Sequence, residues 1–240
     1  MALVENHLIE LLPERDRLRL LARCEPVSLV LAQVLCEIGT PLQHVYFPID
    51  SFISLVTQVD HHPVLEVGML GRDGVLGASL VLGVSVVPLQ ALVQGPGPAW
   101  RVATADFLGE LKRSTALRHY LLRYLYVRMA QLATSAACLR FHLIGPRLAR
   151  WLLMSQDCAH ADHFQVTHEF LSFMLGVRRV GITEAAGEMQ RNGLITYHRG
   201  LVTVLDRLGL EAAACSCYAT DRLAYAEWLG TSSYTPRRTG

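Results

Sequence analysis

Lysine is nearly absent from this 240-residue chain, since Lys112 is the only lysine among its 22 basic residues. With 21 acidic residues, the formal net charge is only +1. Any binding to nucleic acid must therefore depend on a local basic patch and not on a globally basic surface. A hydrophobic share of 51% excludes a disordered chain, and the length suffices for one large domain or two modest ones.

The chain also lacks the marks of secretion and of membrane insertion. Met1–Leu12 has no basic start and no cleavage site, and the six cysteines do not have the spacing of a disulfide framework. Gly74–Trp100 contains no charged residue, as a membrane span would, but its five glycines and three prolines favour buried β-structure. We expect a cytoplasmic protein that does not associate with membranes.

Motifs for catalysis are missing as well. The sequence contains no phosphate-binding glycine loop, no nucleophile elbow and no metalloprotease helix with paired histidines. We therefore expect no enzymatic activity.

Patterns for metal binding are weak in the sequence. Cys24 and Cys36 are not clustered as the ligands of an iron–sulfur centre are. The Cys158–His163 segment is rich in metal-ligand types, but it lies in an expected loop, Asp157–Gln165, without a second paired cluster. Cys215 and Cys217 are too close in sequence for an unstrained disulfide, so we expect free thiols. We predict no metal and no cofactor, with the Cys158–His163 segment as the open alternative.

Residues 1–103 are expected to form a β jelly roll. Turn sequences recur about every ten residues, the rhythm of such a domain, and the runs Phe52–Val56 and Val64–Val67 are expected to pair as a hairpin. The turns lie at Gly39-Thr40-Pro41, Pro48-Ile49-Asp50-Ser51, Asp60-His61-His62-Pro63 and Gly71-Arg72-Asp73-Gly74.

Residues 104–139 show helical periodicity throughout and predict one long helix with two apolar stripes. One stripe contains Leu117, Leu121 and Tyr124, and we expect it to pack on the jelly roll. The other repeats with a 3-4 spacing and is expected to pack on a second copy of the chain. Its members are Leu122, Leu125, Met129, Leu132, Ala136 and Leu139. The alternative is a helix buried entirely within its own chain.

Residues 140–240 contain the succession of elements expected for a winged helix-turn-helix. Thr167 is a good N-terminal cap for a first helix, and a second helix is expected over Val177–Arg191. The strands Leu194–Tyr197 and Leu201–Leu205 then pair as a hairpin, the wing. The core side of the second helix is expected to carry Val180, Ala186 and Met189.

A local basic patch falls on this motif, since Glu184 and Glu188 are the only acids between Arg178 and Arg199. In a helix-turn-helix, the N-terminal end of the second helix enters the major groove of DNA. The residues predicted to bind DNA are Thr167, His168, Arg178, Arg179, Arg191, His198 and Arg199.

The order of these parts resembles the Crp/Fnr family of bacterial transcription regulators, and the likeness covers nearly the full chain. His44–Pro48 and Val67–Gly74 resemble the family's sensor strands, Arg147–Leu152 the helix before the DNA-binding motif, and Thr167–Gly200 the motif itself. The resemblance implies an α+β fold with a cyclic-nucleotide-binding-like jelly roll, a long dimerisation helix and a C-terminal winged helix-turn-helix.

The resemblance also implies roles for single residues. Arg179 matches the family's base-contacting arginine, whereas Val180 replaces a glutamate and Glu184 stands where many members have arginine. We therefore expect a half-site that differs from the familiar one. Thr167 and His168 match positions that contact backbone phosphates in relatives.

The sensor domain departs from the members that bind cyclic AMP. Their phosphate cassette carries Gly-Glu and then Arg-Ser or Arg-Thr, and the corresponding residues here are Gly77-Ala78 and Val87-Pro88. Without these charged partners, an anionic nucleotide would lose its main ion pair. We do not expect cyclic AMP as the effector, and the sequence leaves the ligand-binding residues unknown.

The sequence thus predicts a homodimeric, sequence-specific transcription regulator that binds double-stranded DNA at an inverted repeat. Its effector is unidentified, and contact with RNA polymerase is compatible with the family although no stretch places it. The alternative is a small-molecule-binding regulatory module whose helix-turn-helix docks a protein partner, because Glu184 and Glu188 would face phosphates unfavourably.

Overall fold

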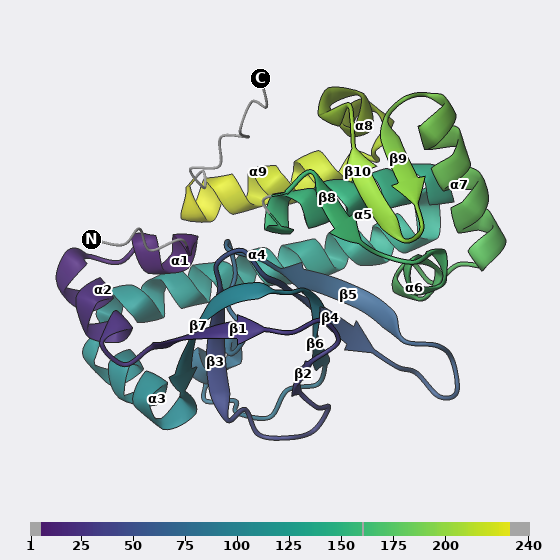
Figure 1. Ribbon diagram of the computed structural model, residues 1–240. Helices are drawn as coiled ribbons and strands as arrows, with labels where there is room; N and C mark the ends of the chain where they lie inside the picture. The colour runs from purple at the N-terminus through teal and green to yellow at the C-terminus, as the bar shows by residue number, and fades with distance from the viewer. Residues whose placement is uncertain (1–5, 160, 231–240) are drawn as a thin grey trace.

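The computed structural model describes residues 6–159 and 161–230. A strand-rich N-terminal domain lies on one side of a long helix, and a smaller C-terminal domain with its own three-stranded sheet lies on the other (Figure 1). This arrangement confirms the predicted α+β fold of jelly roll, long helix and winged helix-turn-helix.

The N-terminal domain packs two antiparallel sheets against each other. One has the strand order β1-β7-β3 and the other β2-β6-β4-β5. The predicted hairpin is confirmed, because β4 pairs with β5 in antiparallel register. Its elements are α1 (His7–Glu10), α2 (Glu14–Leu21), β1 (Glu25–Leu29), β2 (Val34–Cys36), β3 (His44–Pro48), β4 (Phe52–Thr57), β5 (Leu65–Leu70), the 3-10 helix η1 (Ala78–Leu82), β6 (Gln90–Gly95) and β7 (Gly97–Ala103).

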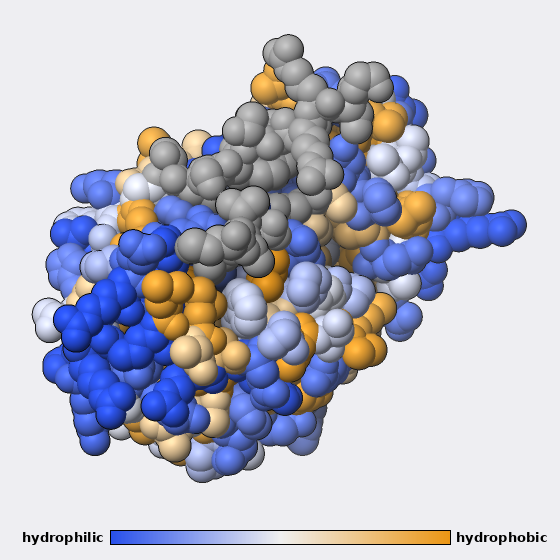
Figure 2. Space-filling view, turned by 60° about the vertical axis from the view of Figure 1, so that its left-hand side comes forward, coloured by the Kyte–Doolittle hydropathy of each residue, from blue (hydrophilic) through white to orange (hydrophobic). Residues whose placement is uncertain are grey.

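The uncharged stretch Gly74–Trp100 includes buried strands of this domain, as expected, but residues 82–86 within it are exposed. It contributes η1, β6 and the first part of β7, and Leu80, Ala91 and Val93 are buried in the main core. Among the residues that the structure describes, no helix is long and apolar enough to cross a membrane. The face drawn in Figure 2 is mainly hydrophilic, with small hydrophobic patches between the polar side chains.

The prediction of one continuous helix from Thr104 to Leu139 is wrong at Ser114. This residue has an extended backbone (φ −112°, ψ 105°) and separates α3 (Thr104–Arg113) from α4 (Thr115–Phe141). The Ser114 hydroxyl accepts a 3.0 Å hydrogen bond from the Leu117 N–H and donates a 2.6 Å bond to Asp16. Ser114 is thus an N-terminal cap, which begins a new helix where periodicity alone predicts none.

Helix α4 has two different apolar faces. The stripe of Leu117, Leu121 and Tyr124 is buried against the jelly roll, as predicted, together with Val127. The second predicted stripe lies mostly in solvent. Its members Leu122, Met129, Leu132, Ala136 and Leu139 are exposed, and Leu125 is half-buried.

The C-terminal domain begins directly after α4. Its elements are α5 (Ile144–Ala159), β8 (His163–Gln165), α6 (His168–Met174), α7 (Arg179–Arg191), β9 (Ile195–His198), β10 (Leu201–Val204), α8 (Arg207–Ala213) and α9 (Cys217–Leu229). The expected loop Asp157–Gln165 is wrong in extent, because α5 continues to Ala159 and β8 begins at His163. His160 lies outside the described residues. Helix α9 returns along α4 (Figure 1), where Trp228 packs edge-on against Tyr126.

The two domains share part of one core. Phe52 and Met69 of the jelly roll are buried in the same cluster as Leu148 and Leu152 of α5 and Leu171 of α6. The position of the winged helix-turn-helix in this structure therefore depends on the sheet edge formed by β4 and β5.

Leu121→Ala is expected to lower the free energy of unfolding by about 2–5 kcal/mol, because the side chain is only 1% exposed and its loss leaves a cavity between α4 and the jelly roll. Leu208→Ala is the control, since Leu208 is 78% exposed and its truncation should change stability by less than about 0.5 kcal/mol. Chemical denaturation of both variants measures the difference. Equal stabilities would contradict the assignment of Leu121 to the core.

Candidate nucleic-acid interface

The helix-turn-helix is built by α6, a tight turn and α7. The Thr167 hydroxyl caps α6 by accepting a 3.1 Å hydrogen bond from the Phe170 N–H. The turn contains Gly176 in the left-handed region (φ +61°), which suits a residue without a Cβ atom. Helix α7 starts at Arg179 and not at the predicted Val177, because Arg178 is still extended (φ −73°, ψ 143°).

Helix α7 turns one face to the domain core and another to solvent. Ala186 and Met189 are buried as predicted, together with Ile182. The expectation for Val180 is wrong, since its side chain is 60% exposed. It lies one position after Arg179 on the first turn, so it belongs to the exposed surface and is available for an apolar contact with a ligand.

The wing is confirmed as a hairpin of β9 and β10, to which β8 adds a third strand. His198 and Leu201 are paired across a two-residue turn made by Arg199 and Gly200. Both turn residues have positive φ, +50° and +82°, as in the turns whose twist matches that of a hairpin. This geometry places the exposed Arg199 at the tip of the wing.

His168 connects the three parts of the motif. Its ring stacks on Tyr197 of β9 at 4.3 Å between centroids, and its Nδ1 atom lies 3.1 Å from the Thr183 hydroxyl on α7. Burial, with a smaller effect of the Arg179 charge, lowers the pKa of His168 below its usual value. The neutral imidazole is therefore favoured at neutral pH, and the side chain is half-buried within the motif.

The predicted DNA-binding residues do not all fall on one surface. Arg178 and Arg179 are exposed at the N-terminus of α7. Thr167 lies beside the wing turn, since a Cβ atom built on Gly200 would be 3.9 Å from its methyl group. Arg191 ends the 13-residue α7, about 18 Å along the axis from the first residue. Arg178 and Arg179 thus lie at the N-terminal end of α7 and Arg199 at the tip of the wing, whereas Arg191 lies at the opposite end of α7.

A half-buried acidic residue, Glu66, links this motif to the jelly roll. Glu66 of β5 accepts hydrogen bonds from the Ser54 hydroxyl, at 2.5 Å, and from the Trp151 indole N–H on α5, at 2.9 Å. Burial raises the pKa of Glu66 to about 7. Sequence reasoning missed this residue, and the only available signal was a single acid within the apolar run Leu65–Leu70.

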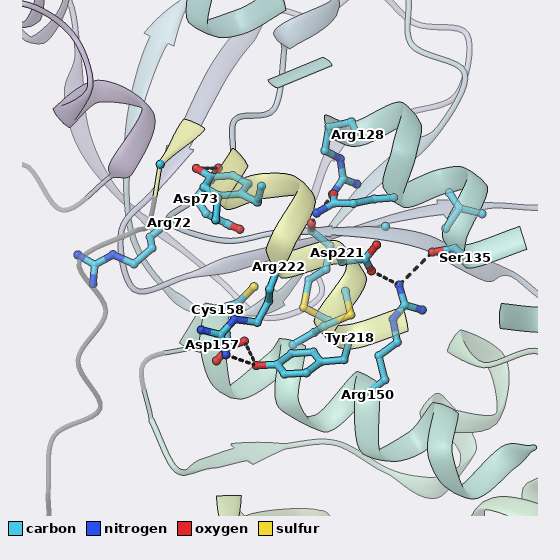
Figure 3. Close-up of a pocket in the computed structure, with 18 residues that line it drawn as sticks. Arg72, Asp73, Arg128, Ser135, Arg150, Asp157, Cys158, Tyr218, Asp221 and Arg222 are labelled. Atoms are coloured by element: carbon cyan, nitrogen blue, oxygen red, sulfur yellow. Dashed lines mark hydrogen bonds and ion pairs between the residues drawn. The ribbon is translucent and has the colours of Figure 1, made fainter. Parts of the chain in front are cut away.

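A pocket of about 200 Å³ lies beneath the C-terminal domain, between β5, α4, α5 and α9. Figure 3 shows Arg150 directed toward Asp221 and Ser135, with an Arg150–Asp221 distance of 2.6 Å. A second contact joins the same two helices, because the Tyr218 hydroxyl of α9 donates a 2.6 Å hydrogen bond to Asp157 of α5. The charged residues that line the pocket come from distant segments of the chain. No local sequence motif therefore predicts this pocket.

The candidate metal segment Cys158–His163 is divided by the fold. Cys158 lines the pocket on α5 and lies against Gly71, whereas His163 is exposed on β8. Within the described residues, these side chains form no cluster of potential ligands. The structure instead brings together Cys138, His142, Cys215 and Cys217.

Comparison with known proteins confirms the resemblance to the Crp/Fnr type. Residues 146–213 match a family model described as the Crp-like helix-turn-helix domain. The search of curated proteins found no match.

Several solved structures share the fold at low sequence identity. FixK2 from Bradyrhizobium japonicum is 12% identical, with 80% of this chain and 98% of that chain covered and a TM-score of 0.67. TTHB099, a CRP-family transcriptional regulator from Thermus thermophilus, is 16% identical, with 78% and 96% covered and a TM-score of 0.64. CLP from Xanthomonas campestris, a c-di-GMP responsive global regulator, is 15% identical, with 81% and 100% covered and a TM-score of 0.62. The chain thus has the fold of these regulators and carries a Crp-like helix-turn-helix.

The stability of the protein is expected to depend on pH through Glu66. Its pKa rises from 4.5 to about 7 on folding, so protonation favours the folded state. The free energy of unfolding should therefore fall as pH rises through this interval, by up to about 3 kcal/mol for this one group. Glu66→Gln, which has nearly the same shape and no charge, should remove this part of the pH dependence.

Glu188→Gln is the control, because Glu188 is exposed on α7. Urea denaturation from pH 5 to pH 8 measures the slope of the unfolding free energy against pH. Identical slopes for the parent protein and Glu66→Gln would show that this carboxyl is not buried in solution.

Proposed function

We propose that this protein is a homodimeric transcription regulator that binds an inverted repeat in double-stranded DNA. The observation that carries the proposal is the exposed arginine pair, Arg178 and Arg179, at the N-terminus of α7 within a Crp-like helix-turn-helix. That end of the second helix is the part that enters the major groove in this class of motif. The proposal assigns no catalytic step to the chain.

Different residues of the motif serve different parts of the DNA. Arg179 donates to the O6 and N7 acceptors of a guanine, and the exposed Val180 offers an apolar contact to a neighbouring thymine methyl group. Thr167 and Arg199 lie near the wing, where they contact phosphates and orient the motif without specifying sequence. His198 belongs to the same phosphate-contacting group, whereas Arg178 clamps the major groove beside Arg179. Arg191 would reach a phosphate farther along the backbone. His168 contributes mainly by holding α6, α7 and the wing together.

The exposed stripe of α4 supports dimerisation. Five of its six members are exposed, and Met129 is 68% exposed although it lies in the middle of the helix. A row of large apolar residues along one helix face is stabilised when a second copy covers it. Two copies joined in this way would present two motifs to half-sites about one helical turn apart, roughly 34–36 Å.

We propose a binding site for the effector but not its identity. The pocket of Figure 3 touches β5, α4, α5 and α9, so a small molecule bound there would contact both domains and the dimerisation helix. Differential affinity of such a molecule for two arrangements of the domains would shift their populations and so change DNA affinity. The uncharged η1 region disfavours an anionic cyclic nucleotide in the family's usual site.

One observation favours a second function. Glu184 and Glu188 are both exposed on α7, where they would repel phosphates. A module that uses α7 to dock a protein partner would tolerate these carboxylates. Salt dependence separates the two functions, because a protein that neutralises several phosphates loses affinity steeply as salt rises.

Arg179→Ala is expected to weaken binding to the preferred DNA site by about 1–3 kcal/mol and to relax specificity at one base pair. Arg199→Ala should weaken binding to all sequences alike and reduce the salt slope by about one unit. Lys112→Ala removes one exposed positive charge far from the motif and serves as the control. Mobility-shift titrations on matched and mutated sites measure these effects, and equal, sequence-independent losses in both arginine variants would contradict the assigned roles.

Met129→Glu is expected to convert the dimer into monomers, because a two-fold interface would bring the introduced carboxylates of both copies together in an apolar surface. The dimer dissociation constant should rise by at least about 10-fold, a change of roughly 1.4 kcal/mol or more. Sedimentation velocity over a concentration series measures it. Leu223→Glu is the control on the exposed face of α9, and an unchanged oligomeric state in Met129→Glu would place the interface elsewhere.

A further inference from the structure

Four side chains with metal-binding atoms converge at the junction between α4 and the C-terminal domain. They are Cys138, His142, Cys215 and Cys217, and their ligand atoms all lie within 4.8 Å of one another. The three thiols are buried and form a small cluster of their own. The sequence did not indicate this group, because its two halves are separated by more than 70 residues.

The local structure of both halves fixes the side chains. Cys138 lies in the last turn of α4, and His142 is the residue that ends this helix, with an extended backbone (φ −102°, ψ 144°). The His142 N–H also donates a 3.1 Å hydrogen bond to the Cys138 carbonyl oxygen. Cys215 precedes the first turn of α9 and is anchored by a 3.2 Å bond from its N–H to the Pro146 carbonyl oxygen, while Cys217 is the first residue of α9.

Two distances within the cluster are close to those around a tetrahedral ion, and no two of the ligand atoms are more than 4.8 Å apart. The sulfur atoms of Cys138 and Cys215 are 3.6 Å apart, and the Cys217 sulfur lies 3.5 Å from the His142 Nδ1 atom. With Zn–S bonds of about 2.3 Å and Zn–N bonds of about 2.0–2.1 Å, tetrahedral angles place two sulfurs about 3.8 Å apart and a sulfur and a nitrogen about 3.5 Å apart. A disulfide would require about 2.05 Å between sulfurs.

The charges around the cluster suit an anionic metal centre. Arg147 of α5 is only 8% exposed and donates a hydrogen bond to the Leu175 carbonyl oxygen. No carboxylate among the described residues forms an ion pair with Arg147, and this side chain lines the same cavity as Cys138. Zinc bound by three thiolates and one neutral imidazole has a net charge of −1, which would balance this buried cation.

The N-terminus of α9 adds a second favourable field. Cys217 is the first residue of this 13-residue helix, where the positive end of the helix dipole would interact favourably with a metal-bound thiolate. A thiolate set with one imidazole is characteristic of structural zinc sites, which have no open coordination position.

We propose that Cys138, His142, Cys215 and Cys217 form a structural zinc site. The bound ion joins the end of the long helix α4 to the start of α9, and so fixes the position of α9 along α4 and beside α5. The site is independent of the proposed DNA-binding activity, because none of its ligands belongs to α6, α7 or the wing.

Metal analysis of the full-length protein tests this proposal. Protein purified under reducing conditions, stripped with a chelator and reloaded with zinc should contain one zinc ion per chain by elemental mass spectrometry. Replacing zinc with Co²⁺ should give the thiolate charge-transfer bands and the intense visible bands of tetrahedral cobalt. Zinc should also raise the melting temperature, since binding to the folded state alone stabilises it.

Cys217→Ser and His142→Ala are expected to weaken zinc binding by more than about 100-fold, because even the loss of groups that only support a ligand costs about 10–100-fold. Cys36→Ser is the matched control: Cys36 is 6% exposed, comparable to Cys217 at 7%, but lies in β2 of the jelly roll, and its replacement should leave zinc content unchanged. The cobalt spectrum of the parent protein needs no variant, so it tests the site even if a ligand variant fails to fold.

Three results would overturn the proposal. They are a zinc content well below one ion per chain after reloading, a cobalt spectrum without thiolate bands, and a Cys138–Cys215 disulfide in protein kept under reducing conditions.

Discussion

The jelly roll and the C-terminal helix α9 both pack on the long helix α4. One face of this 27-residue helix is buried through Leu121, Tyr124 and Val127 in the core of the jelly roll. A second face presents an apolar stripe to solvent, and α9 lies along the same helix (Figure 1). Because these contacts lie on different faces of one helix, a small rotation or shift of α4 would move the jelly roll, the proposed dimer surface and the C-terminal domain relative to one another. This is the geometry that a regulator needs to couple a signal to the spacing of two DNA-binding motifs.

The jelly roll and the winged helix-turn-helix are also coupled directly. Phe52 and Met69 complete the core of the C-terminal domain, and the Glu66 carboxyl receives the Trp151 indole N–H across the boundary. The pocket between β5, α4, α5 and α9 adjoins this contact, because Met69 lines it. Each of these contacts would be strained or broken if α5 changed its angle to the sheet. The proposed zinc site lies at the N-terminal end of α5 and would limit the movement of that end. The contact between α5 and β5 would then be the one that can change.

The sequence predicts those elements of the fold that depend on hydrophobic periodicity and on the residues of turns. The β4–β5 hairpin, the buried stripe of α4, the cap at Thr167 and the wing turn before Leu201 all follow from local patterns, and the structure agrees with them. Local reasoning failed where the decisive contact is distant. Ser114 interrupts the helix because Asp16 and a capping bond stabilise its extended backbone, and Val180 is exposed because the first turn of α7 extends past the domain core. Cys138 and Cys215 meet only after α9 folds back along α4, so the cysteine pattern carried no visible metal motif. The DNA-contacting roles of Arg178, Arg179 and the other predicted residues remain predictions.

The proposed function requires that two copies of this chain bind an inverted repeat through their α7 helices. Selection of genomic DNA fragments by the purified full-length protein, repeated at two salt concentrations, is the test. We expect enrichment of an inverted repeat with half-sites about one helical turn apart, and an affinity that falls steeply with salt. Fragments without a shared repeat, bound with an affinity that salt leaves unchanged, would contradict it.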